Sequence, residues 1–544
     1  MNSETQTIEY KSLQKIRTGD KGFKDLSTTC VALANAQGGQ IFIGYDDKKR
    51  QVLPNQVITA DEVNNAVTRL RSLCFNVALY ASEILSDETG SQYFIITVSP
   101  SMKSVASTSD GKFYMRFADK CEPVRSEDIL RLSEIKGCFQ WEITRSRFHI
   151  DDASRTELHA LAAEIRFSTR IGEHIRQMDD DEIADYYCLV DDGFLTNLGV
   201  IWLGTTKQKN WISYPITVQY IVYDSDENKV RKVEWRNENK NPKELLEAIE
   251  RECIELTYSY EIPDGLFRKQ IRHYHPKVLR ELLVNAMVHQ SMTVSNDIMI
   301  KVYTDRLEIS NPGGLPLGVT KDNILHARHR RNPHFIELMY ALGLMEGEGS
   351  GYDLIYELNS LEAKKKPIVE SSYNECVVTQ YAKILKPEIL PLLDYVMKYY
   401  QLRQKDFTAF GIIAREQKIY ATELSQELQL SSDERLRSYV NMLVKKGLVL
   451  QKGVYKGSYY IVNPLLIKNA KADKIPTTLK TMDSDVLESL ILHDLEKHPM
   501  CKLSEIASRL PDVDIKEVRK LVYALVGKRI RTEGAKTNRR YSLI

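Results

Sequence analysis

The sequence predicts a multidomain α+β protein, and three observations lead to this fold class. First, 544 residues exceed what one hydrophobic core supports, so at about 150 residues per domain we expect three or four domains. Second, stretches with the two-residue period of strands alternate with stretches of helical spacing as far as residue 385. Third, the remainder of the chain repeats an order of two helices followed by a two-stranded ribbon.

Residues 1–135 read as a first α+β domain. Strands are expected at Gly38–Tyr45, Gln92–Pro100 and Lys112–Val124, because apolar residues alternate there between turn residues. A helix over Asp61–Cys74, with Asp61 as its N-cap, lies between the first two strands. A second helix is expected to begin at Ser126.

Two mixed α+β segments follow. Residues 136–270 form a connecting region, whose clearest element is an amphipathic helix over Asn241–Tyr260 with a proline in its first turn. We find no chemistry in this region beyond packing. Residues 271–385 are rich in glycine turns. Their strands are expected at Asn296–Asp305 and Arg306–Pro312, and their helices near residues 275–290 and 332–343.

The carboxy-terminal part contains an internal repeat. Ile419–Asn463 has a short helix, a turn, a longer helix and a two-stranded ribbon, and Cys501–Ile544 repeats that order. The order resembles that of tandem winged helix-turn-helix domains, which we expect at residues 386–470 and 485–544. The polar stretch Lys471–Asp485 links them.

Composition excludes several classes of protein. Hydrophobic residues make up 43% and charged residues 27%, so wholesale disorder and fibrous repeats are excluded. Lys and Arg number 75 against 74 Asp and Glu, so a site for a polyanion must come from local clustering. No apolar run is long enough for a membrane span, the first residues do not resemble a signal peptide, and the eight cysteines form no CxxC pair. We expect a cytoplasmic protein with reduced cysteines and no membrane contact.

Positive charge clusters in the second copy of the repeat. Cys501–Ile544 contains 11 Lys and Arg against 5 Asp and Glu, a local charge of +6. Such a patch favours phosphate contacts, and a helix of this kind fits the major groove of DNA. The candidate nucleic-acid contacts are Arg519, Lys520, Arg531, Lys536, Arg539 and Arg540. Protein contacts or dimerisation are the alternative role for both copies, and the first copy also carries acidic residues.

A polar face is predicted on the helix near residues 275–290. Glu281, Asn285 and His289 stand at i, i+4 and i+8, so they share one face. A carboxylate beside a carboxamide suits activation of water and coordination of Mg²⁺. The alternative is a solvated polar stripe.

Two glycine runs follow this helix. Ser310–Pro316 (SNPGGLP) comes directly after a predicted strand, and Gly347–Gly351 (GEGSG) precedes a helix. Closely spaced glycines let main-chain N–H groups approach phosphate oxygens near a helix N-terminus. Each run alone is more often a turn, but the ordered set is far more specific.

The ordered set resembles the ATP-binding domain of the gyrase, histidine-kinase and MutL superfamily, a Bergerat-type α/β sandwich, over about residues 275–370. Within this superfamily, it resembles the divergent form of the domain that is attached to Schlafen AlbA-like domains. The resemblance implies bound ATP and Mg²⁺, with Glu281 as the base that activates water, Asn285 as the metal ligand and His289 beside the nucleotide.

The same resemblance assigns the remaining positions of the pocket. In the family, a second conserved motif carries an aspartate that binds the adenine amino group. The resemblance aligns this motif with Asn311, Gly313 and Gly314, and Asn311 replaces the aspartate. An amide oxygen can accept from that amine, but the charge-assisted bond is lost. The phosphate loop corresponds to Gly347, Gly349 and Gly351. The lid corresponds to His326–Pro333, whose Arg328, Arg330 and Arg331 would meet the γ-phosphate or form an ordinary basic loop.

The first domain carries a second resemblance. Glu9-Tyr10-Lys11 and Leu33–Asp47 (LANAQGGQIFIGYDD) resemble the Schlafen AlbA-like domain, over about residues 1–135. The resemblance implies nucleic-acid contact, for which Lys11 and Lys15 are candidates, with a solvated charged face as the alternative. Gly38-Gly39 is expected to form the turn that ends a helix and leads into a strand.

Some Schlafen relatives cleave RNA with three carboxylates. The corresponding positions here are Glu4, Glu9 and Asp47, which would bind Mg²⁺ or Mn²⁺ and activate water. The alternative is that Glu9 pairs locally with Lys11 or Lys15 and that Asp47 belongs to a turn.

These features favour an ATP-binding regulator that binds nucleic acid, in transcription or in anti-phage defence. Nucleotide occupancy would control its DNA- or RNA-binding modules. The alternatives are a metal-dependent nuclease acting on RNA or single-stranded DNA, and a slow ATPase that controls protein assembly. We expect a homo-oligomer, a dimer or higher.

Overall fold

The computed structural model describes residues 4–46, 49–212, 216–236, 240–264, 267–316, 318–346, 351–430, 433–453, 457–470, 484–510, 513, 515–534 and 539–544. The chain divides into two compact units. The first comprises Met1–Ile355 and Lys366–Lys383, and the second comprises Tyr356–Lys365 and Ile384–Ile544. Among the residues described, no helix has the length and apolar character needed to cross a membrane.

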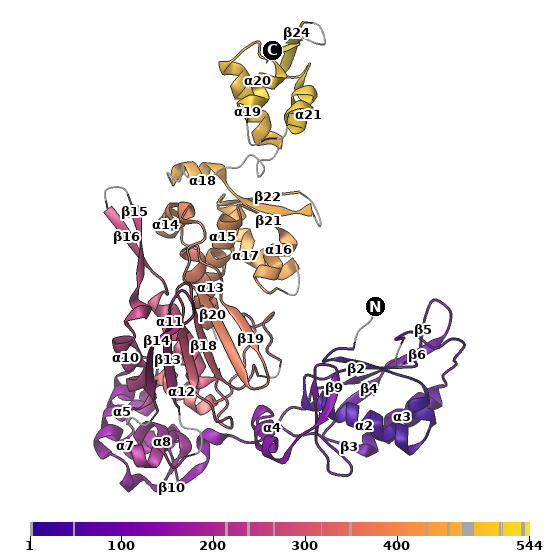
Figure 1. Ribbon diagram of the computed structural model, residues 1–544, viewed down its shortest axis with the longest axis vertical. Helices are drawn as coiled ribbons and strands as arrows, with labels where there is room; N and C mark the ends of the chain where they lie inside the picture. The colour runs from indigo at the N-terminus through magenta and orange to yellow at the C-terminus, as the bar shows by residue number, and fades with distance from the viewer. Residues whose placement is uncertain are drawn as a thin grey trace. The chain divides into compact units, whose positions relative to one another are not determined.

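The first unit begins with a small sheet covered on one face by helices (Figure 1). Its strands, in spatial order, are β1 (Ile8–Lys11), β2 (Gly39–Ile43), β6 (Gln92–Val98) and β4 (Leu79–Ala81). The strands β1 and β2 run parallel, and the other pairs are antiparallel. The covering helices are α2 (Asp20–Asn35) and α3 (Ala60–Leu73). Apolar side chains of both helices and of the sheet, Leu26, Leu70, Ile41 and Phe94 among them, form the core between them.

Local hydrogen bonds fix the ends of these helices. The helix α2 ends at Asn35, and the N–H of Gly38 returns to the carbonyl of Leu33 at 2.8 Å, which forms the predicted turn. The predicted N-cap of α3 is wrong. Thr59 caps this helix in a reciprocal pair with Glu62, and Asp61 lies in the first turn instead.

Two other predicted elements are divided in the structure. The stretch Lys112–Val124 is a hairpin of β8 (Tyr114–Phe117) and β9 (Lys120–Pro123). The helix expected at Ser126 begins as a 3₁₀ turn and continues as α4 (Ile129–Ile135). The remaining short elements here are α1 (Gln14–Arg17), β3 (Cys74–Phe75), β5 (Leu85–Ser86) and β7 (Ser107–Thr108).

A mostly helical segment follows. Its main elements are β10 (Arg145–His149), α5 (Arg155–Phe167), α6 (Glu173–Arg176), α7 (Asp180–Tyr186), β11 (Val190–Asp191), β12 (Phe194–Thr196), α8 (Asn197–Leu203), α9 (Thr206–Lys209) and α10 (Pro242–Glu252). Asn241 and Glu244 cap α10 reciprocally, and its first residue is the expected proline. The helix is shorter than predicted, because Cys253 leaves the helical conformation and Ser259–Asp264 forms a strand.

A six-stranded sheet forms the centre of the first unit. Its order is β14 (Lys229–Trp235), β13 (Val218–Tyr223), β17 (Ile298–Val302), β18 (Arg306–Pro312), β20 (Glu375–Tyr381) and β19 (Ile368–Ser371). The pair β13–β17 is parallel and the others are antiparallel. Strands from both sides of residue 270 therefore share one sheet. A separate hairpin pairs β15 (Ser259–Asp264) with β16 (Phe267–Arg272).

Three helices accompany this sheet: α11 (Pro276–Val288), α12 (Pro333–Ala341) and α13 (Gly351–Leu361). The helix α11 lies against β18. Val284 and Val288 of α11 and Phe335 of α12 are buried in one core with Leu198 and Trp202 of α8. This shared core buries the apolar face of α11.

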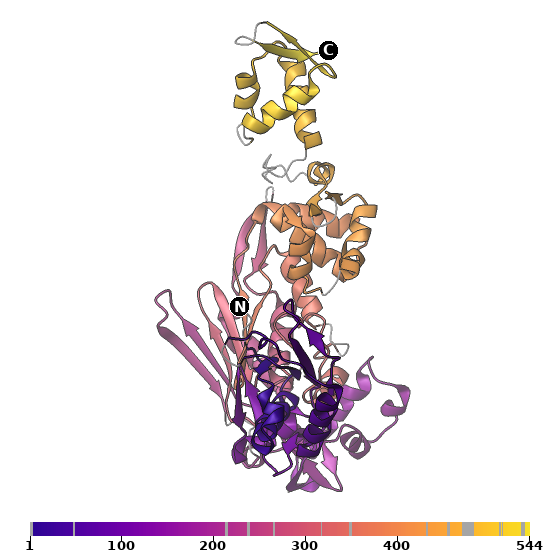
Figure 2. The ribbon, with the colours of Figure 1, turned by 90° about the vertical axis from the view of Figure 1, so that its right-hand side faces the viewer.

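The second unit contains two similar arrangements of helices and strands (Figures 1 and 2). The first comprises α14 (Leu390–Tyr399), α15 (Gln404–Glu416), β21 (Lys418–Tyr420), α16 (Ala421–Glu427), α17 (Asp433–Lys445), β22 (Val449–Lys452), β23 (Tyr459–Val462) and α18 (Pro464–Asn469). The other comprises α19 (Ser484–Lys497), α20 (Leu503–Ser508), α21 (Ile515–Leu525), β24 (Ile530–Glu533) and β25 (Arg540–Leu543).

In each arrangement, the residues just before the short helix also pair with the hairpin, which the sequence pattern does not predict. In the first, β21 pairs with β23 to make a three-stranded sheet. In the second, Cys501 forms a single antiparallel bridge with Tyr541 at the corresponding place.

Candidate functional site

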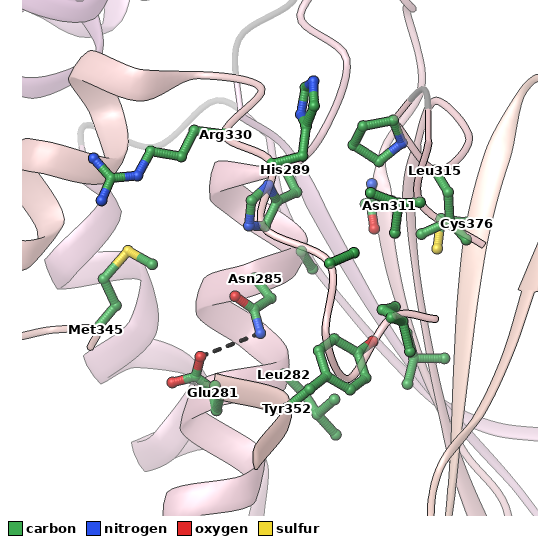
Figure 3. A pocket seen from close by; sticks show the side chains of 18 of the residues that line it. Glu281, Leu282, Asn285, His289, Asn311, Leu315, Arg330, Met345, Tyr352 and Cys376 are labelled. Atoms are coloured by element: carbon green, nitrogen blue, oxygen red, sulfur yellow. Dashed lines mark hydrogen bonds between the residues drawn. The ribbon is translucent and has the colours of Figure 1, made fainter. Parts of the chain in front are cut away.

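A cavity of about 440 Å³ opens beside α11 in the first unit (Figure 3). Its wall comes from α11, from the ends of β18 and β20, from the segment that precedes α12 and from the start of α13. Apolar side chains form most of the wall, among them Leu282, Ala286, Ile309, Leu315, Ile324 and Val378. The polar groups are Glu281, Asn285, His289, Asn311, Arg328, His329, Arg330 and Glu346. A few polar groups converging on an apolar cavity are typical of a small-molecule site.

The helix α11 brings its three predicted residues to this cavity. Figure 3 shows Glu281, Asn285 and His289 one above the other along the helix. The Nδ2 of Asn285 donates to Oε1 of Glu281 at 3.3 Å. The helix ends at Val288, so His289 follows it as the C-cap residue and still lines the cavity.

Burial controls the charge of two of these groups. Glu281 is 3% exposed, and burial raises the pKa of its carboxyl group, although the Asn285 amide opposes the shift. Burial, together with the positive charge of Arg331 and the neighbouring His329, lowers the pKa of His289 to about 4. His289 is therefore neutral at neutral pH and offers hydrogen bonds without charge.

Gly351 is the first residue of α13 and lines the same cavity. A β-carbon at this position would overlap Oε1 of Glu281. The absence of a side chain lets the carboxylate approach the N-terminus of α13, where the helix dipole favours negative charge. Gly347 and Gly349 lie outside the described residues.

Asn311 lies near the end of β18 and is 8% exposed. Its Nδ2 donates to the carbonyl of Pro312 at 3.3 Å, which leaves its amide oxygen as an acceptor. On the neighbouring strand Cys376 stands opposite Asn311, and both residues line the cavity.

The two glycines after Asn311 do not lie in the wall of this cavity. They line a second cavity, of about 660 Å³, instead. Gly313 has a φ of +85°, and a β-carbon there would come within 2.6 Å of the Cβ of Ser291. At Gly314 a β-carbon would overlap the carbonyl oxygen of Ser372. Close packing of the turn therefore accounts for both glycines.

The predicted lid arginines have different positions. Arg328 and Arg330 line the cavity, and Arg328 lies 3.3 Å from the carboxylate of Asp353. Arg331 does not line it. Its guanidinium donates to the carbonyls of His289 at 2.8 Å and Gly314 at 2.7 Å, so it joins the end of α11 to the glycine turn.

Several lining residues were missed in the sequence. Met345 and Tyr352 flank the glycine loop, and their proximity to the predicted phosphate loop was the available signal. Cys376 gave no local signal, because only the pairing of β18 with β20 brings it to Asn311.

The amino-terminal carboxylates are held by neighbouring cations. Glu9 is 5% exposed and pairs with Arg116 and, at 2.7 Å, with Lys11. Glu4 accepts from the N–H of Tyr10 at 3.3 Å and lies 3.7 Å from Arg50. In the described part of the chain, no three His, Cys, Asp or Glu side chains gather as they would around a metal ion. Asp47 lies outside the described residues.

The two amino-terminal lysines take part in local ion pairs. Lys15 lies 2.7 Å from Asp25, and Lys11 contacts Glu9. These carboxylates neutralise the positive charge that a phosphate contact would use.

The candidate basic residues of the carboxy-terminal repeat that the structure describes are exposed. Arg519 and Lys520 lie on α21, and Arg531, Arg539 and Arg540 lie on or beside the ribbon β24–β25. Arg531 donates to Oγ of Ser542 at 3.0 Å, and Arg540 donates to the carbonyl of Met500 at 2.9 Å. Lys536 lies outside the described residues.

A buried carboxylate next to the lid gives a first testable prediction. Glu142 accepts from the N–H groups of His334 at 3.1 Å and Phe335 at 2.8 Å, at the start of α12. Burial nevertheless raises its pKa from 4.5 to about 7. The folded protein therefore holds this proton more tightly than the unfolded chain. The resulting stability is fully present below pH 4.5 and is lost as the pH rises through about 7.

We expect Glu142→Gln to remove this pH dependence, which corresponds to about 3 kcal/mol. Thermal unfolding of wild type and variant across this pH range measures it. Two stability curves that run parallel would contradict the assignment.

Comparisons with known proteins identify two segments of the chain. Residues 4–125 match the family model described as "Schlafen, AlbA_2". Residues 295–379 match the model described as "Putative ATP-dependent DNA helicase recG C-terminal". No curated protein matches the chain. Among solved structures, the chain is similar to the DIP2311 protein from Corynebacterium diphtheriae, with 18% identity, a TM-score of 0.48 and coverage of 99% of this chain and 95% of that chain. The protein is thus a mixed α+β multidomain chain that carries a Schlafen AlbA_2 domain at its amino terminus and a domain of the RecG C-terminal family in its middle.

Proposed function

We propose that the protein binds ATP and Mg²⁺ in the cavity beside α11, and that it binds nucleic acid through its carboxy-terminal basic module. The protein would then act as a regulator whose affinity for nucleic acid changes when the nucleotide binds. The observation that carries the proposal is the convergence of Glu281, Asn285, Asn311 and Arg330 on one apolar cavity. A volume of about 440 Å³ lies in the usual range of small-molecule sites.

The residues of the cavity fit this ligand. The Nδ2 of Asn285 is used by Glu281, so its amide oxygen is left as a ligand of the type that Mg²⁺ prefers. Arg328 and Arg330 supply positive charge for phosphate oxygens. The apolar wall suits a purine ring. Mg²⁺ would neutralise phosphate charge, and Glu281, whose pKa burial raises, would accept a proton from water as a stronger base than an exposed carboxylate.

The folds of the neighbouring parts support the proposal. A mixed sheet flanked by α11 is the architecture expected of a Bergerat-type nucleotide domain, although two of its strands, β13 and β14, precede residues 271–385. In the second unit, each repeat has a short helix, a longer helix and then a two-stranded hairpin. This order supports winged helix-turn-helix domains at residues 386–470 and 485–544, and the exposed cations of α21 suit phosphate contacts.

Two measurements on the full chain test the function. Calorimetric titration with ATP, with and without Mg²⁺, is expected to show binding that requires the metal. Band-shift assays with duplex DNA and with RNA are expected to show an affinity that changes when ATP and Mg²⁺ are added. Absence of ATP binding at millimolar concentration would refute the nucleotide site, and absence of any band shift at low salt would refute the nucleic-acid site.

The base specificity gives a second prediction. Pro312 uses the amide donor of Asn311, so the remaining acceptor selects a purine with an exocyclic amino group. We expect wild type to bind ATP about 10-fold more tightly than inosine triphosphate, whose oxygen replaces that amine. The variant Asn311→Ala is expected to lose the preference, as competition titration would show. A preference that persists in Asn311→Ala would rule out this reading of the base.

A further inference from the structure

The short helix α4 follows the AlbA_2 domain and carries buried charge at an unusual density. Arg131 is 7% exposed, Glu134 is 8% exposed, and Lys136, its C-cap residue, is 4% exposed. Burying charge is costly unless hydrogen bonds compensate it. The partners of these side chains therefore show what α4 holds together.

Glu134 is bound to the segment that follows α11. Its Oε1 accepts from the N–H of Met292 at 3.0 Å, and its Oε2 accepts from the hydroxyls of Ser291 and Thr293. The three donors belong to consecutive residues, which begin two positions after His289. The carboxylate thus fixes the chain directly behind the polar helix of the cavity.

The same segment is joined to the other side of the cavity. The N–H of Ser291 donates to the carbonyl of Pro312 at 2.8 Å, and Pro312 follows Asn311. The turn at Gly313 packs against Ser291 so closely that a β-carbon would come within 2.6 Å. Glu134 therefore supports both the end of α11 and the end of β18.

Arg131 makes a second contact with the central sheet. Its guanidinium lies 3.6 Å from the ring centre of Tyr373 and donates to Oδ1 of Asn374 at 3.0 Å. These residues lie in the turn between β19 and β20, and β20 carries Cys376 in the cavity wall.

Lys136 reaches in the other direction, into the AlbA_2 domain. Its ammonium donates to the carbonyls of Ala34 at 2.8 Å and Ser101 at 2.9 Å. Ala34 lies in the last turn of α2, where a cation also interacts favourably with the helix dipole. Side chains only two positions apart thus hold two different domains.

We propose that Glu134 is a positioning residue of the nucleotide site, and that α4 links nucleotide binding to the anchoring of the AlbA_2 domain. The inference rests on the proposed ATP site. When ATP orders the ends of α11 and β18, it also orders the carboxylate of Glu134, which is bonded to the segment between them. Lys136 then holds the carboxy-terminal end of α2 in the AlbA_2 domain more firmly. By linkage, anchoring of that domain raises the affinity for ATP by the same factor.

Variants at the two ends of α4 separate these effects. Glu134→Ala leaves three donors without their acceptor, and we expect ATP affinity to fall about 10-fold. Glu134→Gln keeps one acceptor oxygen and the side-chain shape, and should recover part of the affinity. Lys136→Met leaves the cavity side intact but removes the anchor, so its ATP affinity is expected to fall only by the coupling factor, and by less than that of Glu134→Ala.

Hydrogen exchange over residues 4–125 supplies the second readout. In wild type, ATP with Mg²⁺ is expected to slow exchange at the end of α2, and both Glu134→Ala and Lys136→Met should lose this response. Glu122→Gln, an exposed change on β9, is the matched control and should behave as wild type. A purely structural role would lower the melting temperature of the variants without abolishing the response to ATP.

The outcomes distinguish the inference from the function on which it rests. A wild-type chain that binds no ATP refutes the proposed function. A wild-type chain that binds ATP, beside a Glu134→Ala variant with equal affinity and an equal exchange response, refutes the inference and leaves the function standing. If Glu134→Ala does not fold, Ser291→Ala removes one of the same hydrogen bonds, and wild-type behaviour of that variant and of Glu134→Gln would overturn the proposal.

Discussion

Replacing Asn285 by alanine is expected to weaken Mg²⁺-dependent ATP binding by about 30- to 100-fold. The change removes an oxygen ligand for the metal and also removes the amide that donates to Glu281 at 3.3 Å. A buried carboxylate without its donor costs more than a neutral group would. Calorimetric titration with ATP, with Mg²⁺ and with a chelator, measures the effect.

Asn210→Ala is the matched control for this experiment. Asn210 is exposed and does not line the cavity, so its loss should leave ATP affinity unchanged. We expect Asn285→Ala and wild type to differ in ATP affinity only when Mg²⁺ is present, because binding requires the metal. Wild-type affinity of Asn285→Ala in Mg²⁺ would show that the nucleotide does not bind beside α11.

The second large effect concerns the exposed cations of the last repeat. Replacing Arg519, Lys520 and Arg539 together by glutamine is expected to reduce the salt dependence of nucleic-acid binding. The slope of the logarithm of the binding constant against the logarithm of the salt concentration should decrease in magnitude by about three. The affinity should fall equally for unrelated sequences, because phosphates carry no sequence information. Fluorescence anisotropy at several salt concentrations measures both quantities.

A control with the same change in net charge distinguishes local phosphate contacts from an effect of the total charge of the protein. Lys207, Lys229 and Lys277 are exposed in the first unit, and their replacement by glutamine should leave the slope unchanged. If both triple variants show the same slope as wild type, the basic module does not contact phosphate.

Local patterns in the sequence predicted much of the fold. The spacing of apolar residues located α11, β17 and β18 within a few residues of their observed bounds. The start of α10 was also predictable, because its capping asparagine and first-turn proline are local signals. The pairing of β13 with β17 was not, since it joins residues about 80 positions apart and no periodicity encodes such a partner.

The same distinction holds for the candidate site. The spacing of Glu281, Asn285 and His289 placed them on one helix face, and the structure brings all three to the cavity. The positions of Gly313 and Arg331 could not be read in this way. Both are determined by the turn at Ser291 and the end of α11, which meet them only in the folded chain.

The fit between Glu281 and Gly351 restricts how this protein can diverge. Because the carboxylate occupies the volume that a β-carbon at position 351 would need, alanine at 351 would displace the carboxylate of Glu281 from its observed position. Shortening the acid by one methylene would make room for alanine at the other site. In a combinatorial library selected for activity, the two positions should therefore covary, and glycine should persist wherever the longer acid is retained.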